Sequence, residues 1–408
     1  MTALQRILAG FSPVAIGLGI TMSVSYGTMF YSFAILAPAI MAEFGWSRTL
    51  VFGSFSVALL ASAVFAPLSG RVMDRLGGRV VLSMGSVLAS LALAAMFFVQ
   101  TPFAYLAALI AIEAMATFVQ YEAGFTAMTQ IRQGKARAAI SAITLIAGFS
   151  STIFWPLCSF LLEHFSWQQV YLWLAAINLA VCLPIHLSLP RHEASLNPAA
   201  AAQETPLPEP LAGRDRAVAL AALALSFSAA GFAVVAVQAH LPRLLLETGY
   251  SVAAAATVGA MIGPFQVGAR VIEVLFGQSR HPLWTALAGN GALLAGAALM
   301  FAFVLGMPAA IAFAAFFGAG QGLAHIIRGA VPLYLFGAQG YGKLTGNLGF
   351  FRILVTASAP FAIAWVSDLG GNRLGIAAIA AAGLLAFLPV IPLLRYASLQ
   401  QAGKATAR

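Results

Sequence analysis

The stretch "SGRVMDRLGGRVVL", residues 69–82, concentrates charge in a chain that carries little of it elsewhere. Arg71, Asp74, Arg75 and Arg79 fall within nine residues, whereas only 8% of the 408 residues are charged. Long apolar runs precede and follow the stretch. We therefore interpret it as a short charged loop between two membrane-spanning segments.

The composition is that of a membrane protein. Hydrophobic residues make up 61% of the sequence, whereas a soluble domain contains about 45–50%. Runs of about 20 apolar residues, long enough to cross a hydrocarbon core of about 30 Å, recur along the chain. Such spans must be helices, because a helix satisfies its backbone hydrogen bonds internally. Short alternating segments of the kind that build a membrane barrel are not found. The sequence predicts an all-α membrane protein.

Clusters of Gly, Pro and charged residues divide the chain into twelve expected spans. These lie near residues 13–40, 50–70, 80–99, 102–129, 138–162, 167–189, 217–242, 251–274, 283–305, 308–336, 344–366 and 374–394. The segment 190–216 is rich in Pro, Ala and charge, which is typical of a flexible linker. The expected organisation is an N-terminal six-helix bundle at 1–189, a cytoplasmic linker at 190–216 and a C-terminal six-helix bundle at 217–408.

Lys and Arg mark the cytoplasmic side of a membrane protein. Alternate loops and both chain ends hold most of these residues, whereas the opposite loops hold only Arg48, Arg243 and Arg373. We therefore expect a multi-pass protein of the bacterial inner membrane with both termini in the cytoplasm. The net charge of +9 then reflects topology, so the lipid bilayer is an expected partner and nucleic acid is not.

The two halves of the chain resemble each other. A shift of 204 positions aligns two prolines, one glycine and one serine, and a shift of 199 sets Arg71 on Arg270 and Asp74 on Glu273. Together with the linker at the midpoint, these matches favour two homologous six-helix bundles. Transporters built from such repeats bind substrate where the repeats meet and move one repeat against the other.

Gly70, Asp74, Arg75, Gly77 and Arg79 fit the pattern G-x-x-x-D-R-x-G-x-R. This pattern resembles the signature loop between helices 2 and 3 of the major facilitator superfamily, although a glycine follows Gly77 where many members carry a second basic residue. The resemblance covers essentially the whole chain and implies two six-helix bundles that work by alternating access. It also implies that these five residues form a conformational latch.

In that family the loop aspartate faces the positive N-terminal end of helix 11, which is expected to begin here near Leu344. The degenerate copy after the eighth span suggests that Arg270 and Glu273 form a second latch. The alternative is that the basic residues only enforce topology, which would not account for Asp74 or for the spacing of the glycines.

The motif "FGWSRT" at 44–49 resembles the branch of the superfamily that contains oxalate/formate exchangers and monocarboxylate transporters. The first span, however, lacks the acidic and glycine-rich motif of the animal monocarboxylate carriers. The fifth span, "SAITLIAGFSSTIFWPL", lacks the G-P-x-x-G-G element typical of many drug/proton antiporters. The sequence therefore favours a carrier of organic anions over a drug exporter.

A stripe of polar side chains follows one face of the tenth span. Gln321, His325 and Arg328 are spaced i, i+4, i+7 and so share a helix face. Arg352 on the eleventh span lies at a similar depth, about 12 Å from the cytoplasmic end at about 1.5 Å per residue. Two cations at one level predict an anion site, because a guanidinium can bind a carboxylate through two parallel hydrogen bonds.

These residues also allow structural interpretations. Arg328 could pair with Glu122 of the other half, and Arg352 could bind a backbone carbonyl at a helix break. Tyr26 and Tyr31 on the first span are expected to border the substrate cavity, although aromatic residues in membrane helices usually serve packing.

The fourth span carries two glutamates. Glu113, Thr117 and Gln120 share one face, whereas Glu122 lies about 180° from Glu113 on an undistorted helix. We expect Glu113 to carry a coupled proton, because a buried carboxyl binds a proton more readily than one in water. Glu122 is expected to be structural or a latch partner, and His240 an interface residue near the outer surface.

No enzyme motif, nucleotide-binding loop or clustered Cys/His metal site is found in the sequence, so we expect neither enzymatic activity nor a cofactor. The predicted function is gradient-driven transport of a small organic anion such as a monocarboxylate, by proton symport or by exchange for a second anion. The alternative is proton-coupled export of drugs, metalloid-containing or other xenobiotic compounds. A membrane sensor that binds a ligand without transporting it is the alternative from another functional class. The expected oligomeric state is a monomer.

Overall fold

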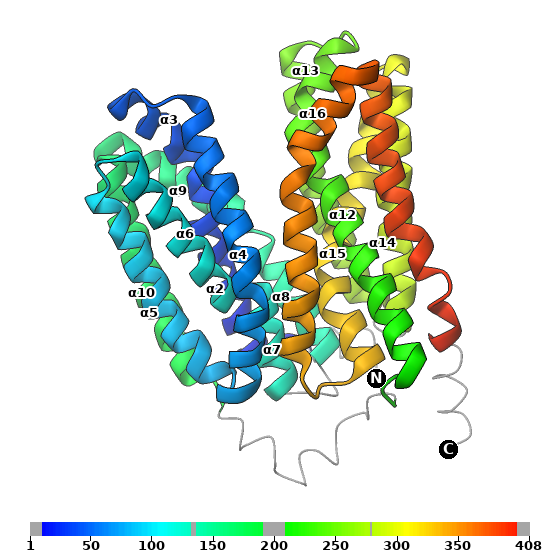
Figure 1. Ribbon diagram of the computed structural model, residues 1–408, viewed down its shortest axis with the longest axis horizontal. Helices are drawn as coiled ribbons and strands as arrows, with labels where there is room; N and C mark the ends of the chain where they lie inside the picture. Colours follow the sequence, from blue (N-terminus) through cyan, green and yellow to red (C-terminus); the bar gives the residue numbers. More distant parts are fainter. Residues whose placement is uncertain (1–9, 132–135, 191–208, 278–279, 398–408) are drawn as a thin grey trace. The chain divides into compact units, whose positions relative to one another are not determined.

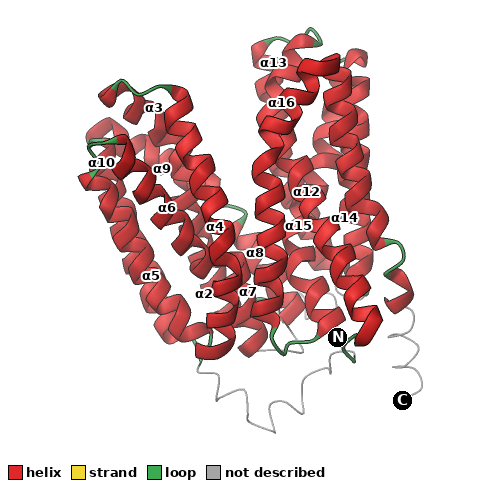
Figure 2. Cartoon of the chain, in the orientation of Figure 1, coloured by secondary structure: helices red, strands yellow, loops and turns green. Residues whose placement is uncertain are grey.

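The computed structural model describes residues 10–131, 136–190, 209–277 and 280–397. Within these ranges the chain is built of helices joined by short loops (Figure 2). Eleven of the described helices are long and apolar enough to cross a membrane. Most of the predicted linker lies outside the described residues.

The chain divides into two compact units. Unit 1 consists of Met1–Pro206 together with Ala338–Phe350, and unit 2 consists of Leu207–Gly337 together with Phe351–Arg408. Residues 338–350, which the sequence analysis placed in the C-terminal bundle, are therefore grouped with the N-terminal part of the chain. The bundle limits at 189 and 217 stay a prediction.

Unit 1 contains helices α2 to α10, which take the blue to blue-green part of the colour scale in Figure 1, together with the first turns of α16. Their bounds are α2 (Pro13–Tyr26), η1 (Gly27–Tyr31), α3 (Ser32–Phe44), α4 (Arg48–Leu76), α5 (Gly78–Ala95), η2 (Met96–Phe98), α6 (Pro102–Val119), α7 (Tyr121–Ile131), α8 (Ala136–Ala147), α9 (Ser150–His164) and α10 (Trp167–Ser188). A buried apolar core joins α2, η1, α3, α4, α5, α6, α9 and α10.

Three spans of unit 1 are interrupted part-way. The first contains a π-helical turn at η1, the fourth breaks at Gln120 (φ −93°, ψ −165°), and the fifth breaks between Ala147 and Ser150. The sequence analysis assumed an undistorted fourth span when it placed Glu113 and Glu122 on opposite faces. That assumption is wrong, because the extended backbone at Gln120 resets the rotation of α7 relative to α6.

Unit 2 contains α12 (Gly213–Glu247), α13 (Val252–Phe276), α14 (Pro282–Leu299), η5 (Met300–Leu305), α15 (Met307–Phe336), the greater part of α16 (Tyr341–Phe387) and η6 (Leu388–Val390). The last apolar stretch, Tyr341–Ala397, has 57 residues, about 85 Å at about 1.5 Å per residue, far too long for one crossing. It divides at Gly370 and Gly371, and Gly371 adopts a φ of 75°. The stretch thus supplies the eleventh and twelfth predicted spans.

Glycines let α15 approach its neighbours closely. A Cβ atom on Gly318 would lie 2.6 Å from the carbonyl oxygen of Ile262 on α13, and one on Gly322 would overlap the carbonyl of Gln266. On another face, a Cβ atom on Gly320 would meet α14. Small residues at such contacts are the usual way in which membrane helices pack. This packing fixes the rotation of α15 and hence the direction of its polar stripe.

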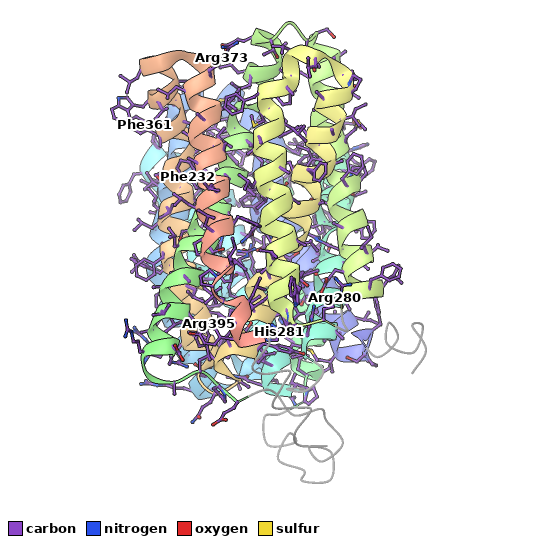
Figure 3. The ribbon with its side chains drawn as sticks, turned by 90° about the vertical axis from the view of Figure 1, so that its right-hand side faces the viewer. Phe232, Arg280, His281, Phe361, Arg373 and Arg395 are labelled. Atoms are coloured by element: carbon purple, nitrogen blue, oxygen red, sulfur yellow. The ribbon has the colours of Figure 1, made fainter. Side chains whose placement is uncertain are left out.

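The charged loops of unit 2 separate to its two ends. Arg280, His281 and Arg395 lie at one end and Arg373 at the other (Figure 3). At the first end Arg395 pairs with Asp215 at 3.2 Å, and the hydroxyl of Tyr396 donates to the same carboxylate at 2.8 Å. The assignment of this end to the cytoplasm stays a prediction.

Candidate functional site

The turn between α4 and α5 explains the glycine spacing of the charged loop. Gly77 adopts a φ of 80°, which favours glycine, and α5 begins at the next residue. The side chain of Gln130 on α7 accepts a hydrogen bond from the Gly78 N–H at 2.8 Å and donates to the Met73 carbonyl at 2.9 Å. Gln130 therefore holds both sides of the turn, a role that no motif in the sequence indicated.

Gly78 departs from the basic residue that many superfamily members carry at this position. A Cβ atom there would overlap the Cβ atom of Ala127 on α7. The close approach of α5 to α7 thus excludes a larger side chain, so the departure from the motif has a local packing cause.

Asp74 binds the N-terminus of α16. Its carboxylate accepts hydrogen bonds from the backbone N–H of Gly342 at 2.9 Å and of Lys343 at 2.7 Å. Both amides belong to the first turn of α16, where no intrahelical carbonyl can accept from them and where the helix dipole favours an anion. All of these atoms lie in unit 1. The structure therefore brings Asp74 to the helix start that the family resemblance implied.

A pair of glycines permits this contact. A Cβ atom on Gly70 would overlap the carbonyl oxygen of Gly342, and one on Gly342 would lie 2.5 Å from the carbonyl oxygen of Gly70. One turn further on, a Cβ atom on Gly346 would overlap the Ala66 carbonyl. The backbones of α4 and α16 can therefore touch only because these positions are glycines. Arg75 is exposed and Arg79 half-buried, and the latch role of the five motif residues stays a prediction.

The counterpart residues in unit 2 are buried. Arg270 and Glu273 on α13 have exposed fractions of 2% and 6%. The Arg270 Nε donates to the Gly322 carbonyl on α15 at 3.0 Å, and the Thr285 hydroxyl on α14 donates to Glu273 at 3.1 Å. These contacts join three helices of one unit. The role of the two residues as a second latch stays a prediction.

The predicted anion-binding residues lie together in unit 2. Gln321, His325 and Arg328 are half-buried on α15. His325 interacts electrostatically with Arg328, with Arg270 on α13 and with Arg352 on α16. Three guanidinium groups from three helices therefore act electrostatically on one imidazole, and we call these four residues the cation cluster. The sequence analysis had assigned Arg270 to a latch and had not placed it here.

Two polar atoms beside the cation cluster lack a hydrogen-bond partner among the described residues. They are the Oε1 atom of Gln321 and the hydroxyl oxygen of Thr356, and both are buried. Thr356 faces α12, where a Cβ atom on Gly231 would overlap its hydroxyl and lie 3.4 Å from Cγ of Arg352. Gly231 thus makes room for the polar side chains of α16, a role that the sequence did not reveal.

Tyr26 and Tyr31 lie where the breaks of unit 1 meet. They bracket the π-helical turn η1, and their ring centroids are 6.5 Å apart. Tyr26 packs on Tyr121, the first residue after the break of the fourth span, at 4.7 Å, and Tyr31 packs on Trp155 of α9 at 6.2 Å. Breaks of this kind often mark functional positions in membrane helices. The substrate role of the two tyrosines stays a prediction.

Glu113 is buried in the core of unit 1. Its exposed fraction is 4%, and its Oε1 atom has no hydrogen-bond partner among the described residues. It lies eleven residues from the start of α6, about 17 Å along the helix axis and so near the middle of a membrane. Glu122 lies in the first turn of α7. In unit 2, the Nε2 atom of His240 lies 2.9 Å from the carbonyl oxygen of Pro360.

Solved transporters share this fold. The human organic anion transporter MFSD10 (TETRAN) gives a TM-score of 0.71 at 16% identity, with 95% of this chain and 99% of that chain covered. The proton:xylose symporter XylE gives 0.70 at 14% identity, with 95% of each chain covered. The E. coli fucose:proton symporter FucP gives 0.70 at 16% identity, with 94% and 98% covered. At these identities the likeness shows the fold alone. A search of curated proteins finds no significant match.

A sequence model of the Major Facilitator Superfamily matches residues 18–324, well over half of the chain. The predicted all-α membrane fold is thereby confirmed, whereas the oxalate/formate exchanger and monocarboxylate branch is not distinguished by these comparisons. The chain therefore belongs to the Major Facilitator Superfamily and is a multi-pass secondary transporter rather than an enzyme.

Proposed function

We propose that the protein transports a small organic anion, such as a monocarboxylate, by alternating access with proton symport or anion exchange. The cation cluster is the observation that carries this proposal. Charged side chains within membrane helices are costly and usually serve a function, so three guanidinium groups that act on the imidazole of His325 require a functional reason. A negatively charged substrate is the simplest reason, because it neutralises part of the buried charge.

Each polar group has a proposed part in binding. The guanidinium groups of Arg352 and Arg328 are planar, and each can donate two parallel hydrogen bonds to a carboxylate. Gln321 and His325 add hydrogen bonds on the same face of α15 and favour polar substituents on the substrate. Tyr26 and Tyr31 of unit 1 stay predicted substrate contacts. The likeness to a human organic anion transporter agrees with this substrate class.

Glu113 is the proposed proton carrier. Burial in an apolar core penalises its ionised form, so the carboxyl is stable when protonated and costly when charged. A proton that binds here can be coupled to substrate movement. Two of the structurally similar proteins are described as proton symporters, which agrees with this assignment. Asp74 is proposed to hold one conformation through the start of α16 and to release it in each cycle.

Ligand-dependent stability tests the substrate class. Purified protein would be screened by thermal unfolding against carboxylates, amines and neutral compounds. A ligand at 100 times its dissociation constant stabilises the folded state by about 2.7 kcal/mol, which a thermal shift can detect. Carboxylates should stabilise the wild type and Arg373→Gln, whose arginine is exposed just after the bend of α16 at Gly371, but not Arg352→Gln. Stabilisation by amines or neutral compounds alone would contradict the proposal.

Transport itself is measured in proteoliposomes. A stabilising carboxylate should accumulate when the outside is acidified, and the accumulation should be lost in Glu113→Gln while exchange of labelled for unlabelled substrate continues. Net movement outward under the same gradient would favour the alternative function, proton-coupled export. Ligand binding without any transport would favour a sensor.

A further inference from the structure

Four titratable side chains gather inside unit 1 on α6, α9 and α10. They are Tyr105, Glu113, Cys158 and Tyr171, with exposed fractions of 0%, 4%, 0% and 2%. Tyr171 interacts electrostatically with each of the other three. We call this set the buried polar cluster. It belongs to unit 1, whereas the cation cluster belongs to unit 2.

Packing alone does not explain the buried polar cluster. The Tyr105 hydroxyl oxygen and Glu113 Oε1 are buried without a hydrogen-bond partner among the described residues. A buried polar group left in this state costs about 1–3 kcal/mol, and phenylalanine would fill the same space as tyrosine without this cost. Two such groups on one helix in the apolar core of unit 1 indicate that the polar atoms serve a chemical purpose.

The cluster begins close to one end of unit 1 and extends inward. Tyr105 lies three residues from the start of α6, about 5 Å along its axis, whereas Glu113 lies about 12 Å deeper. Tyr171 follows Trp167, the first residue of α10, by one helical turn. The distribution of Lys and Arg assigns this end of the unit to the outer side of the membrane.

An exposed carboxylate marks the outer end of the cluster. Glu43, at the end of α3, accepts hydrogen bonds from the Trp167 indole N–H and from the Gln168 amide, both at 2.7 Å. The Trp167 and Tyr171 ring centroids are 6.2 Å apart, and the Tyr105 ring lies 5.5 Å from the ring of Trp46. Contacts between side chains thus lead from Glu43 at the surface through Trp167 to Tyr171, which interacts electrostatically with Glu113.

Helices α4 and α5, which pack against α6, carry their charged side chains far from Glu113 along the chain. Of the described side chains, the charged ones on α4 are Arg71, Asp74 and Arg75, near its C-terminal end, and the one on α5 is Arg79, near its start. Both positions lie at the predicted cytoplasmic end of unit 1. Glu122, on the helix α7 that follows α6, lies nine residues further along the chain than Glu113. Within the buried polar cluster, Tyr171 is the residue that interacts electrostatically with Glu113.

We propose that the buried polar cluster is a proton entrance that connects the outer surface to Glu113 through the interior of unit 1. This inference rests on the proposed proton-carrying role of Glu113. A proton from water near Glu43 passes through the Tyr105 and Tyr171 hydroxyls in turn, and each hydroxyl releases its own proton inward, directly or through ordered water. The Glu113 carboxylate accepts the last proton and becomes a neutral carboxyl. Each hydroxyl ends as it began, so no other reactant is needed.

The exchange of the Glu113 proton with solvent tests this route without a substrate. Full-length protein in lipid nanodiscs is mixed rapidly with D2O, and the infrared band that Glu113→Gln removes is followed in time. Tyr171→Phe and Tyr105→Phe should keep this band but slow its isotope shift by about tenfold or more, since a relaying acid–base group typically contributes about 100-fold or more. Tyr250→Phe, which removes a hydroxyl bound to the Phe303 carbonyl in unit 2, should exchange as the wild type does.

The outcomes separate this inference from the proposed function. Wild-type exchange rates in both tyrosine variants would overturn the entrance, while the thermal-shift and transport results would stand. If one variant does not fold, the other decides the question, because each hydroxyl is required. If Glu113→Gln removes no protonation-dependent band, Glu113 does not bind the proton and both the entrance and the coupling role are wrong.

Discussion

Neutralising Asp74 should loosen the first turn of α16. Asp74→Asn keeps an acceptor oxygen at the same place but removes the charge from two hydrogen bonds, at 2.9 and 2.7 Å, and from the interaction with the helix N-terminus. A hydrogen bond to a charged group contributes about 1.5–3 kcal/mol, and solvent exposure of Asp74 reduces this. We expect a loss of about 1–2 kcal/mol, which corresponds to a change of about 5–30-fold in the local opening equilibrium.

Amide hydrogen exchange measures this loss where it occurs. The N–H groups of Gly342 and Lys343 should exchange about 5–30-fold faster in Asp74→Asn than in the wild type. Arg75→Gln, which changes the adjacent exposed charge, should leave both rates unchanged. The difference between wild type and Asp74→Asn should shrink as salt is added, because exposed charges are screened. Equal rates in the wild type and in Asp74→Asn would refute the view that this carboxylate holds the start of α16.

Three further substitutions test close packing and buried polar contacts. Gly70→Ala should lower transport without abolishing folding, because its Cβ atom would push the Gly342 carbonyl away; overpacking of this kind costs about 1–3 kcal/mol, measurable as a lower melting temperature. Asn290→Ala removes a side chain that donates to Ser226 and to the Ala386 carbonyl, both buried, and should lower the free energy of unfolding by about 1–3 kcal/mol; an unchanged denaturation midpoint would contradict this. Gly231→Ala should weaken carboxylate binding in the thermal-shift assay while stability without ligand falls little; equal loss of both would mean that the glycine serves packing alone.

The sequence was sufficient to predict the fold because its signals are long and local. Apolar runs of span length and a charged loop with glycines at defined positions indicate twelve helices and the family, and neither depends on tertiary contacts. The resemblance of the charged loop to the family signature implied that Asp74 faces the start of the eleventh helix, and its hydrogen bonds to Gly342 and Lys343 lie there. The polar stripe of α15 also followed from helical spacing.

The rest depends on contacts between segments far apart in the chain. The π-helical turn at Gly27–Tyr31 and the break at Gln120 do not change the spacing of apolar residues in the sequence. The direction in which Glu122 projects from its helix therefore could not be predicted. Arg270 joins the cation cluster because Gly318 and Gly322 bring α13 against α15, and a helical wheel of either helix alone cannot show this. Nothing in the sequence shows that α6, α9 and α10 bury Tyr105 and Tyr171 in one cluster with Glu113 and Cys158.

The three interrupted spans all belong to unit 1, whereas the described guanidinium groups of the cation cluster all belong to unit 2. On the proposed roles, the two halves suggested by the sequence repeat differ in function, one serving proton coupling and the other binding negative charge. A protein engineered from two copies of the same half would contain either two buried polar clusters or two cation clusters, but not one of each. Such a symmetric molecule could keep the fold, yet it could not couple proton binding to substrate transport.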